Sequence, residues 1–134
     1  KNIYSEIYIK SINSFAFNLV ALKTEFTNLK ISRSKKTIKL IKNIMNEFET
    51  IVKRLNIPIY QTINSRIKQT LLSKNHTMSM LNDYNSGRKV EIMHCWNNLN
   101  LLNKAINTKT KLSERTYNLV IKKIKNNAKN IKYF

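Results

Sequence analysis

The chain has 134 residues, of which 42% are hydrophobic and 24% charged, a composition typical of a globular domain that buries a core rather than of a disordered chain. No apolar run approaches the roughly 18 residues that a membrane-spanning helix needs, and no signal peptide is visible. The one cysteine, Cys95, cannot form an internal disulfide, which suits a reducing cytoplasm. The chain begins with Lys1 inside a helical pattern, so we expect a fragment of a longer protein.

The net charge of +18 has two interpretations. A strongly basic domain is typical of proteins that bind nucleic acids or anionic membranes. The lysines are nevertheless spread along the chain among abundant Asn and Ile, as AT-rich codons produce, and this favours a solvated basic surface. The densest basic runs are Lys35-Lys36 and residues 122–125.

Apolar residues recur at helical spacing along the chain and predict six helices. The first covers residues 1–26. The second follows Ser34, a suitable N-cap, and ends near Leu55, before Pro58 interrupts the pattern. The apolar face expected for the first helix consists of Ile3, Ile7, Ile12, Phe15, Leu19 and Leu22.

The remaining four helices are predicted at about residues 61–73, 77–86, 89–106 and 113–131. The helix at 77–86 is expected to end at Gly87, because glycine best adopts the left-handed conformation at a helix C-terminus. Alternation with a period of two is not sustained. The expected fold is therefore all-α, a multi-helix bundle.

Neither a phosphate loop nor a metal site is predicted. One glycine in the whole chain cannot form a Gly-rich loop. The soft metal ligands are His76, His94 and Cys95, and the last two are adjacent in a predicted helix, so their side chains diverge by about 100°. Cys95 has no base nearby in the sequence and is expected to be an inert thiol.

Residues 79–92, SMLNDYNSGRKVEI, place the single glycine between Asp83 and Glu91. This stretch resembles the pattern S-S-M-x-Q-D-x-x-x-G-R-x-T-E-I of the C-terminal domain of 2-dehydropantoate 2-reductase (ketopantoate reductase), with Asn82 in place of Gln. The matching residues are Ser79, Met80, Leu81, Asp83, Gly87, Arg88, Glu91 and Ile92.

The resemblance continues in order along the chain. Residues 47–57 look like the second helix of the family, and residues 107–112 look like its G-x-x-T-P-x segment. Asn56 and Asn107 stand where the family has glycine, and Ser14 and His76 stand where it has Asn. The opening helix and following turn of the family are matched by Tyr8, Lys10, Asn18, Thr27 and Asn28.

The resemblance implies the fold of the C-terminal domain of ketopantoate reductase and 6-phosphogluconate dehydrogenase-like proteins, over residues 1–134. It implies the NADPH-dependent reduction of ketopantoate to pantoate in coenzyme A biosynthesis. Lys10 would donate the proton, and Glu91 would orient the Lys10 side chain. Asn18, Asn28 and Ser79 would bind the substrate.

In the family the NADPH binds a preceding Rossmann domain, which this chain lacks. The chain is therefore expected to be inactive alone, and a homodimer is expected because the helical domain is where family members commonly pair.

Two other interpretations stay open. A basic helical module that binds nucleic acid would gather lysines on one surface and bind DNA in a salt-dependent way. A structural or dimerisation domain with decayed catalytic positions would keep its core without a polar cleft. Taken alone, Lys10 is a solvated lysine, Glu91 a favourable charge at a helix start, and Asn28 and Ser79 capping residues. Asp83 is expected to be a structural partner.

Overall fold

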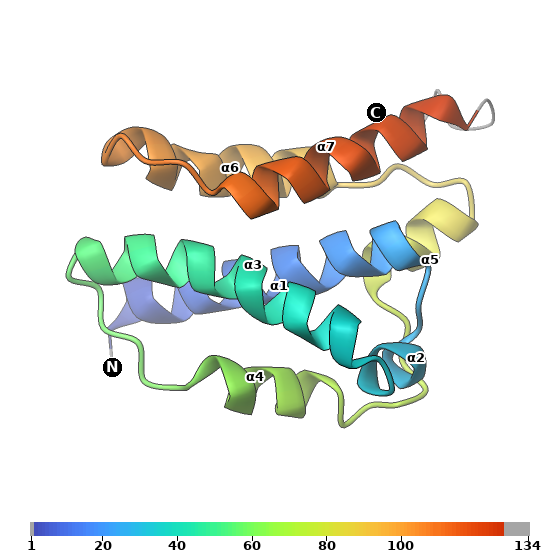
Figure 1. Ribbon diagram of the computed structural model, residues 1–134, viewed down its shortest axis with the longest axis horizontal. Coiled ribbons are helices and arrows are strands. Elements are labelled where there is room, and N and C mark those ends of the chain that lie inside the picture. The colour runs from blue at the N-terminus through green and yellow to red at the C-terminus, as the bar shows by residue number, and fades with distance from the viewer. Residues whose placement is uncertain (1, 128–134) are drawn as a thin grey trace.

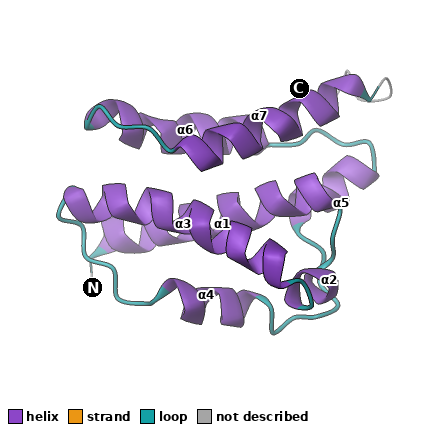
Figure 2. Cartoon of the chain, viewed as in Figure 1, coloured by secondary structure: helices purple, strands orange, loops and turns teal. Residues whose placement is uncertain are grey.

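The computed structural model describes residues 2–127, which form α-helices and, within that range, no strand (Figure 2). The expected all-α fold is confirmed. The predicted helical positions Ala128 and Ile131 lie outside the described residues. The helices are α1 (Ile3–Thr24), α2 (Asn28–Ser32), α3 (Lys35–Arg54), α4 (Ile63–Thr70), α5 (Ser79–Asn85), α6 (Ile92–Ala105) and α7 (Lys111–Asn126).

The helices are arranged in three layers (Figure 1). One outer layer contains α6 and α7, the middle layer α1 and α3, and the other outer layer α2 and α4. Helix α5 lies at one end and links the outer layers. Helix α1 packs against α3, α5, α6 and α7, and is therefore the centre of the fold.

The middle of α1 is buried on every side. All eight residues of Phe15–Leu22 are at most 2% exposed. The predicted apolar face was wrong at the start of this helix, where Ile3 is 65% and Ile7 51% exposed. Ile7 lines a surface cavity between α1 and α6 and is not packed into the core, so periodicity alone does not locate the core there.

Four aromatic rings from four helices meet in the core. Phe15 of α1 meets Phe48 of α3 edge to face at 5.7 Å between ring centroids. Trp96 of α6 stacks on Phe15 at 5.9 Å and on Tyr117 of α7 at 4.9 Å. Such pairs each add about 0.5–1.5 kcal/mol beyond the area they bury. The cluster therefore joins the outer layer of α6 and α7 to the middle layer of α1 and α3.

Four helix ends within residues 2–127 use a left-handed residue, and one of them is Glu25 after α1, with φ 57°. Gly87 has φ 70°, as predicted, and Asn56 and Asn107 have φ 59° and 53°. After α5 the Arg88 N–H donates to the Asp83 carbonyl at 2.8 Å, the closing bond of a Schellman motif. Asparagine tolerates this conformation, which explains how it replaces glycine at two ends.

Helix α7 begins at Lys111, two residues earlier than predicted. Its first turn is capped from another helix: the Glu47 carboxylate of α3 accepts the backbone N–H of Leu112 at 2.9 Å and that of Ser113 at 2.7 Å. A carboxylate there also meets the positive end of the helix dipole. A contact between residues so far apart in the chain has no local sequence signal.

Helix α6 begins at Ile92, three residues later than predicted, with Glu91 at its N-cap. Val90 is 4% exposed and packs in the core, and the non-helical segment that carries it, residues 88–90, delays the helix. The five-residue helix α2 was not predicted, because it is too short to show a period; Thr27 caps it and accepts the Lys30 N–H.

No helix within residues 2–127 has the length and apolar character needed to cross a membrane.

Candidate functional site

A groove of about 440 Å³ separates the N-terminal half of α1 from α6. One wall carries the exposed Lys10 together with Ser14, and the other carries Cys95 and Asn98. Ile7, Tyr8 and Leu99 make part of the lining apolar. The groove can therefore hold a small molecule that has both an apolar part and polar or anionic groups. We call it the α1–α6 groove.

Asn18 lies one turn beyond Ser14 on α1 and joins this helix to α5. It is 2% exposed. Its Nδ2 donates to the Ser14 carbonyl at 2.8 Å, and its Oδ1 accepts the Met80 N–H at 3.0 Å. That N–H belongs to the first turn of α5, where Met78 provides no side-chain cap. Asn18 thereby fixes Ser79, the exposed first residue of α5, beside α1.

Glu91 lies at the N-cap of α6, one turn before Cys95. Its carboxylate is exposed and forms no ion pair with any of residues 2–127. The pKa of the Cys95 thiol is raised, first by burial and second by the nearby Glu91 carboxylate. The charge of Glu91 therefore acts at the groove, where Cys95 lies.

Asn28 is fully buried and stands apart from the groove. Its backbone N–H donates to the His76 carbonyl at 3.0 Å. Its Nδ2 donates to the carbonyls of Thr70 and Ser73 at 3.2 and 3.3 Å, and its Oδ1 is buried without a partner. Its side chain therefore does not reach the α1–α6 groove.

Of the five predicted site residues, Lys10 alone lines the α1–α6 groove. Glu91 lies one turn before Cys95, which also lines the groove, and the buried Asn18 bonds to the Ser14 carbonyl and to the N–H of Met80, the residue after Ser79. Cys95 and Asn98 were missed as lining residues. The spacing of 91, 95 and 98, which places all three on one face of a helix, is a signal that could have indicated them.

Asp83 has the structural role that was predicted. Its Oδ1 accepts the Nε–H of Arg88 at 3.1 Å across the turn at Gly87. Within residues 2–127, no three His, Cys, Asp or Glu side chains are grouped so that they could hold a metal ion.

A second polar cluster lies where α1 meets α3 and α4. Arg66 of α4 is 2% exposed; its Nε donates to the Asn13 side-chain oxygen at 3.0 Å, and its Nη1 to the Gln61 carbonyl at 2.8 Å. Its Nη2 forms an ion pair with Glu49 of α3, which is 3% exposed. Asn13 therefore faces α4 and does not take the place of Ser14 in the groove. The sequence did not predict this cluster.

Comparisons with known proteins agree with this description. Residues 2–124 match the family described as ketopantoate reductase PanE/ApbA C terminal. A solved structure, the PanE/ApbA family ketopantoate reductase from Ralstonia eutropha JMP134, has a TM-score of 0.76 and 16% sequence identity to the chain. The match covers 90% of this chain and 41% of that one, so the chain spans less than half of that relative. No curated protein matches.

The fold and the family match define an all-helical C-terminal domain from a family of oxidoreductases. The chain belongs to the ketopantoate reductase PanE/ApbA C-terminal family, and the resemblance found in residues 79–92 is confirmed.

Proposed function

We propose that this chain is the substrate-binding half of an NADPH-dependent 2-oxo acid reductase that converts ketopantoate to pantoate in coenzyme A biosynthesis. Membership of the family supports the reaction class. The observation that carries the proposal is the α1–α6 groove, which places the Lys10 ammonium beside a mixed polar and apolar cavity. A 2-oxo acid with a branched carbon chain has the chemistry that this lining fits.

Lys10 would serve as the proton donor. Negative charge develops on the ketone oxygen during reduction, and an ammonium group beside that oxygen stabilises the charge and supplies the proton. Glu91 would orient Lys10 and accept a hydrogen bond from the product hydroxyl. Its exposed carboxylate has no ion-pair partner in residues 2–127, and this leaves it available for the role.

The residues predicted to bind the substrate are Asn18, Asn28 and Ser79. The Ser79 hydroxyl is exposed next to Asn18, which supports a bond to the substrate carboxylate. Asn18 would act mainly by holding α5 against α1, because its amide already donates to the Ser14 carbonyl and accepts the N–H of Met80, the residue after Ser79. Asn28 is fully buried apart from the groove, so it would support the site indirectly, through its bonds to the carbonyls of Thr70 and Ser73.

The cofactor would be held by another domain. NADPH, when bound, supplies the hydride, and the one glycine of this chain leaves it without a Gly-rich loop for the pyrophosphate. We propose that residues 1–134 form one helical domain that follows a Rossmann domain in a cytoplasmic homodimer, and that they are inactive alone. The 41% coverage of the solved relative supports a larger parent protein.

The test is to join this chain to the Rossmann domain of a ketopantoate reductase and to follow NADPH oxidation by absorbance. We expect turnover with ketopantoate. Lys10→Met should lower kcat by about 100-fold or more, the range for loss of a general acid. Lys104→Met removes an exposed lysine of α6 outside the groove and should have no effect. An active hybrid with an unchanged Lys10→Met rate would exclude Lys10 as the donor.

A second candidate, polyanion binding, has one observation in its favour. Lys35, Lys39 and Lys42 are exposed and lie on the same face of α3, as their helical spacing requires. This candidate predicts that the chain binds duplex DNA and that log K falls linearly with log salt concentration. Equal affinity for DNA at low and high salt would exclude it.

A further inference from the structure

A groove of about 380 Å³ lies where α4 and the residues that follow it meet α3. Its apolar lining consists of Ile38 of α3 together with Ile67, Leu71 and Leu72. Leu71 is 6% exposed, whereas Leu72 is 70% exposed, so the groove has both a recessed and a projecting aliphatic contact. It shares no lining residue with the α1–α6 groove, and α4 lies in the opposite outer layer from α6 (Figure 1). We call it the α4 groove.

The surface around the α4 groove carries one sign of charge. Four exposed lysines surround it, two in its lining and two on the same face of α3 as Ile38, namely Lys68, Lys74, Lys35 and Lys42. Every residue that lines the groove comes from residues 26–46 or 50–82, and neither stretch contains an Asp or a Glu. A concave surface of one charge sign attracts partners of the opposite sign. The α4 groove therefore favours a partner that carries carboxylates.

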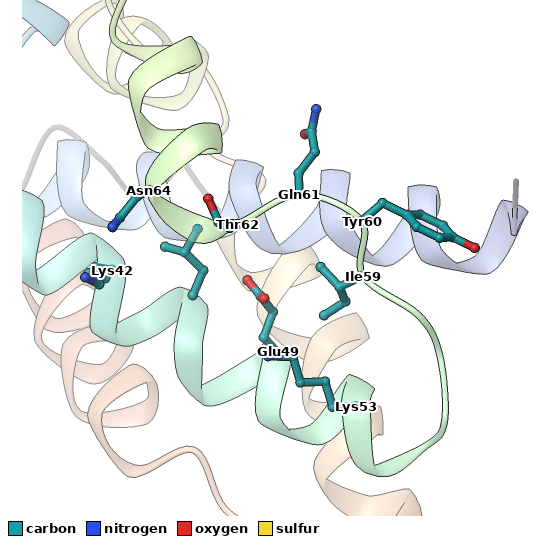
Figure 3. Close-up of a pocket in the computed structure, with 9 residues that line it drawn as sticks. Lys42, Glu49, Lys53, Ile59, Tyr60, Gln61, Thr62 and Asn64 are labelled. Atoms are coloured by element: carbon teal, nitrogen blue, oxygen red, sulfur yellow. The ribbon is translucent and has the colours of Figure 1, made fainter.

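The basic surface continues beside the α4 groove into a cavity between α3 and the start of α4. Asn64 lines both hollows, and Figure 3 shows it together with Lys42 in the neighbouring cavity. The one carboxylate in the lining of that cavity, Glu49, is 3% exposed and paired with Arg66, so it adds little negative charge to the surface. The two hollows together extend along α4 and the segments on either side of it, a length that suits a peptide segment.

Three other occupants fit this lining less well. The bases of a nucleic acid stack on aromatic side chains, and within residues 2–127 no aromatic ring lines the α4 groove. A flat bilayer reaches Leu72 but not Ile67 and Leu71, which are 5% and 6% exposed. A second copy of the chain carries the same net charge of +18 and is repelled.

We propose that the α4 groove binds an acidic amphipathic helix of a partner protein. The apolar residues of that helix, three or four positions apart, pack on Leu71 and Leu72, and its Asp or Glu side chains pair with Lys68 and Lys74. This partner accounts at once for the exposed Leu72 and for the surroundings without carboxylates. The proposal is independent of the proposed reductase function.

The test uses three fluorophore-labelled peptides of about 20 residues, titrated with the chain while fluorescence anisotropy is followed. The first has leucines at helical spacing and glutamates between them. The second replaces the leucines with alanine, and the third replaces the glutamates with glutamine. We expect saturable binding of the first peptide and binding at least about tenfold weaker for the other two, because each lacks one kind of contact. Equal binding of the leucine-free peptide would mean general attraction to a basic surface and would overturn the proposal.

The apolar contact is tested by Leu72→Ser and its matched control Leu119→Ser. Both replace an exposed leucine, but Leu119 lies on α7, outside the α4 groove, and is 53% exposed. We expect Leu72→Ser to weaken the binding of the first peptide about tenfold, since burial of a leucine side chain is worth at least that much, and Leu119→Ser to leave it unchanged. Equal effects of the two would place the peptide elsewhere and overturn the proposal.

The charge contact is tested by Lys68→Glu and Lys104→Glu. Both reverse the charge of an exposed lysine and so change the net charge equally, but only Lys68 lines the α4 groove. We expect Lys68→Glu to weaken the binding of the first peptide at least about tenfold and Lys104→Glu to change it less than about twofold. Equal losses would show that only the net charge matters, which contradicts a docking groove.

Duplex DNA and vesicles of anionic phospholipid test the competing occupants. We expect that neither depends on Leu72 for binding. Binding of either that is tighter than that of the first peptide and is lost in Leu72→Ser would assign the α4 groove to that occupant and overturn the proposal. None of these measurements involves NADPH or ketopantoate, so a failure here and a failure of the reductase test are distinguishable.

Discussion

At the scale of single residues, Arg66 is the largest side chain that the fold buries completely. Each of its three nitrogens has an acceptor, on Asn13, Gln61 and Glu49. A buried guanidinium is stable only while its charge is compensated, since transfer of an unpaired charge from water costs several kcal/mol. The Arg66 side chain of α4 therefore joins α4 to α1, through Asn13, and to α3, through Glu49.

We predict that Glu49→Ala lowers the free energy of unfolding by about 3–5 kcal/mol, because it leaves the Arg66 charge buried and unpaired. The double variant Glu49→Leu, Arg66→Met should recover most of this loss, because both charges are gone and the volume is kept. Urea unfolding at neutral pH measures both. A single variant that loses less than about 1 kcal/mol would show that water reaches Arg66.

The thiol of Cys95 gives a second prediction at this scale. Its raised pKa means that the folded chain holds the thiol proton more tightly than the unfolded chain does. The stability contributed by this group is therefore full below the ordinary thiol pKa and is lost as pH rises through the raised value. Alkylation of Cys95 should be slow near neutral pH, with a profile displaced to higher pH than that of a free thiol.

Glu91→Gln removes the second cause of that shift and should move the alkylation profile of Cys95 part of the way back. Glu114→Gln, which changes an exposed carboxylate on α7, is the control. An unchanged profile in Glu91→Gln would place the Glu91 carboxylate away from the groove. This result would count against its proposed role beside Lys10.

At the scale of helices, the start of α7 depends on a residue of α3. We predict that Glu47→Ala lowers the free energy of unfolding by about 1–2 kcal/mol, because the N–H groups of Leu112 and Ser113 lose their acceptor. Glu114→Ala is the matched control. Glu114 is itself in the first turn of α7 and carries the same charge near that helix end, but its side chain makes no cap. Equal losses would mean that only general charge matters.

The helix ends show which boundaries a sequence predicts. Ser34 and Gly87 were predicted and are confirmed, because their residue types act within one turn of the chain. The start of α7 could not be predicted, since Glu47 lies more than sixty residues before it in the chain. The prediction of where α6 starts was wrong for a related reason, because the burial of Val90 in the core overrides the helical pattern of the local sequence.

The candidate site divides in the same way. Residues 79–92 predicted the family, and Lys10 does line a groove. What the sequence did not indicate is the opposite wall, with Cys95 and Asn98, or the contact of Asn18 with Met80, because both depend on how α1 packs against α5 and α6. The catalytic roles of Lys10 and Glu91 stay predictions.

At the scale of the whole molecule, the net charge of +18 works against compactness, because like charges repel most strongly when the chain is folded. Surface ion pairs such as Lys123 with Glu25 at 2.9 Å offset little of this. We predict that raising NaCl from about 10 mM to about 300 mM increases Tm, since the Debye length falls from about 30 Å to less than 8 Å.

An uncharged osmolyte series serves as the reference for changes in solvent structure. A Tm that stays constant or falls with NaCl would mean that the lysines are far enough apart not to interact. It would also weaken the case for any polyanion-binding face on α3, since such a face needs a concentrated charge.

The burial of Phe15–Leu22 on every side has a consequence for biosynthesis. This apolar segment leaves the ribosome well before α6 and α7, which cover it, have been translated. Its contacts span nearly the whole described sequence, so the core closes late and the segment is exposed to chaperones and to self-association until then. Truncation within α7 should therefore yield insoluble protein rather than a smaller folded domain.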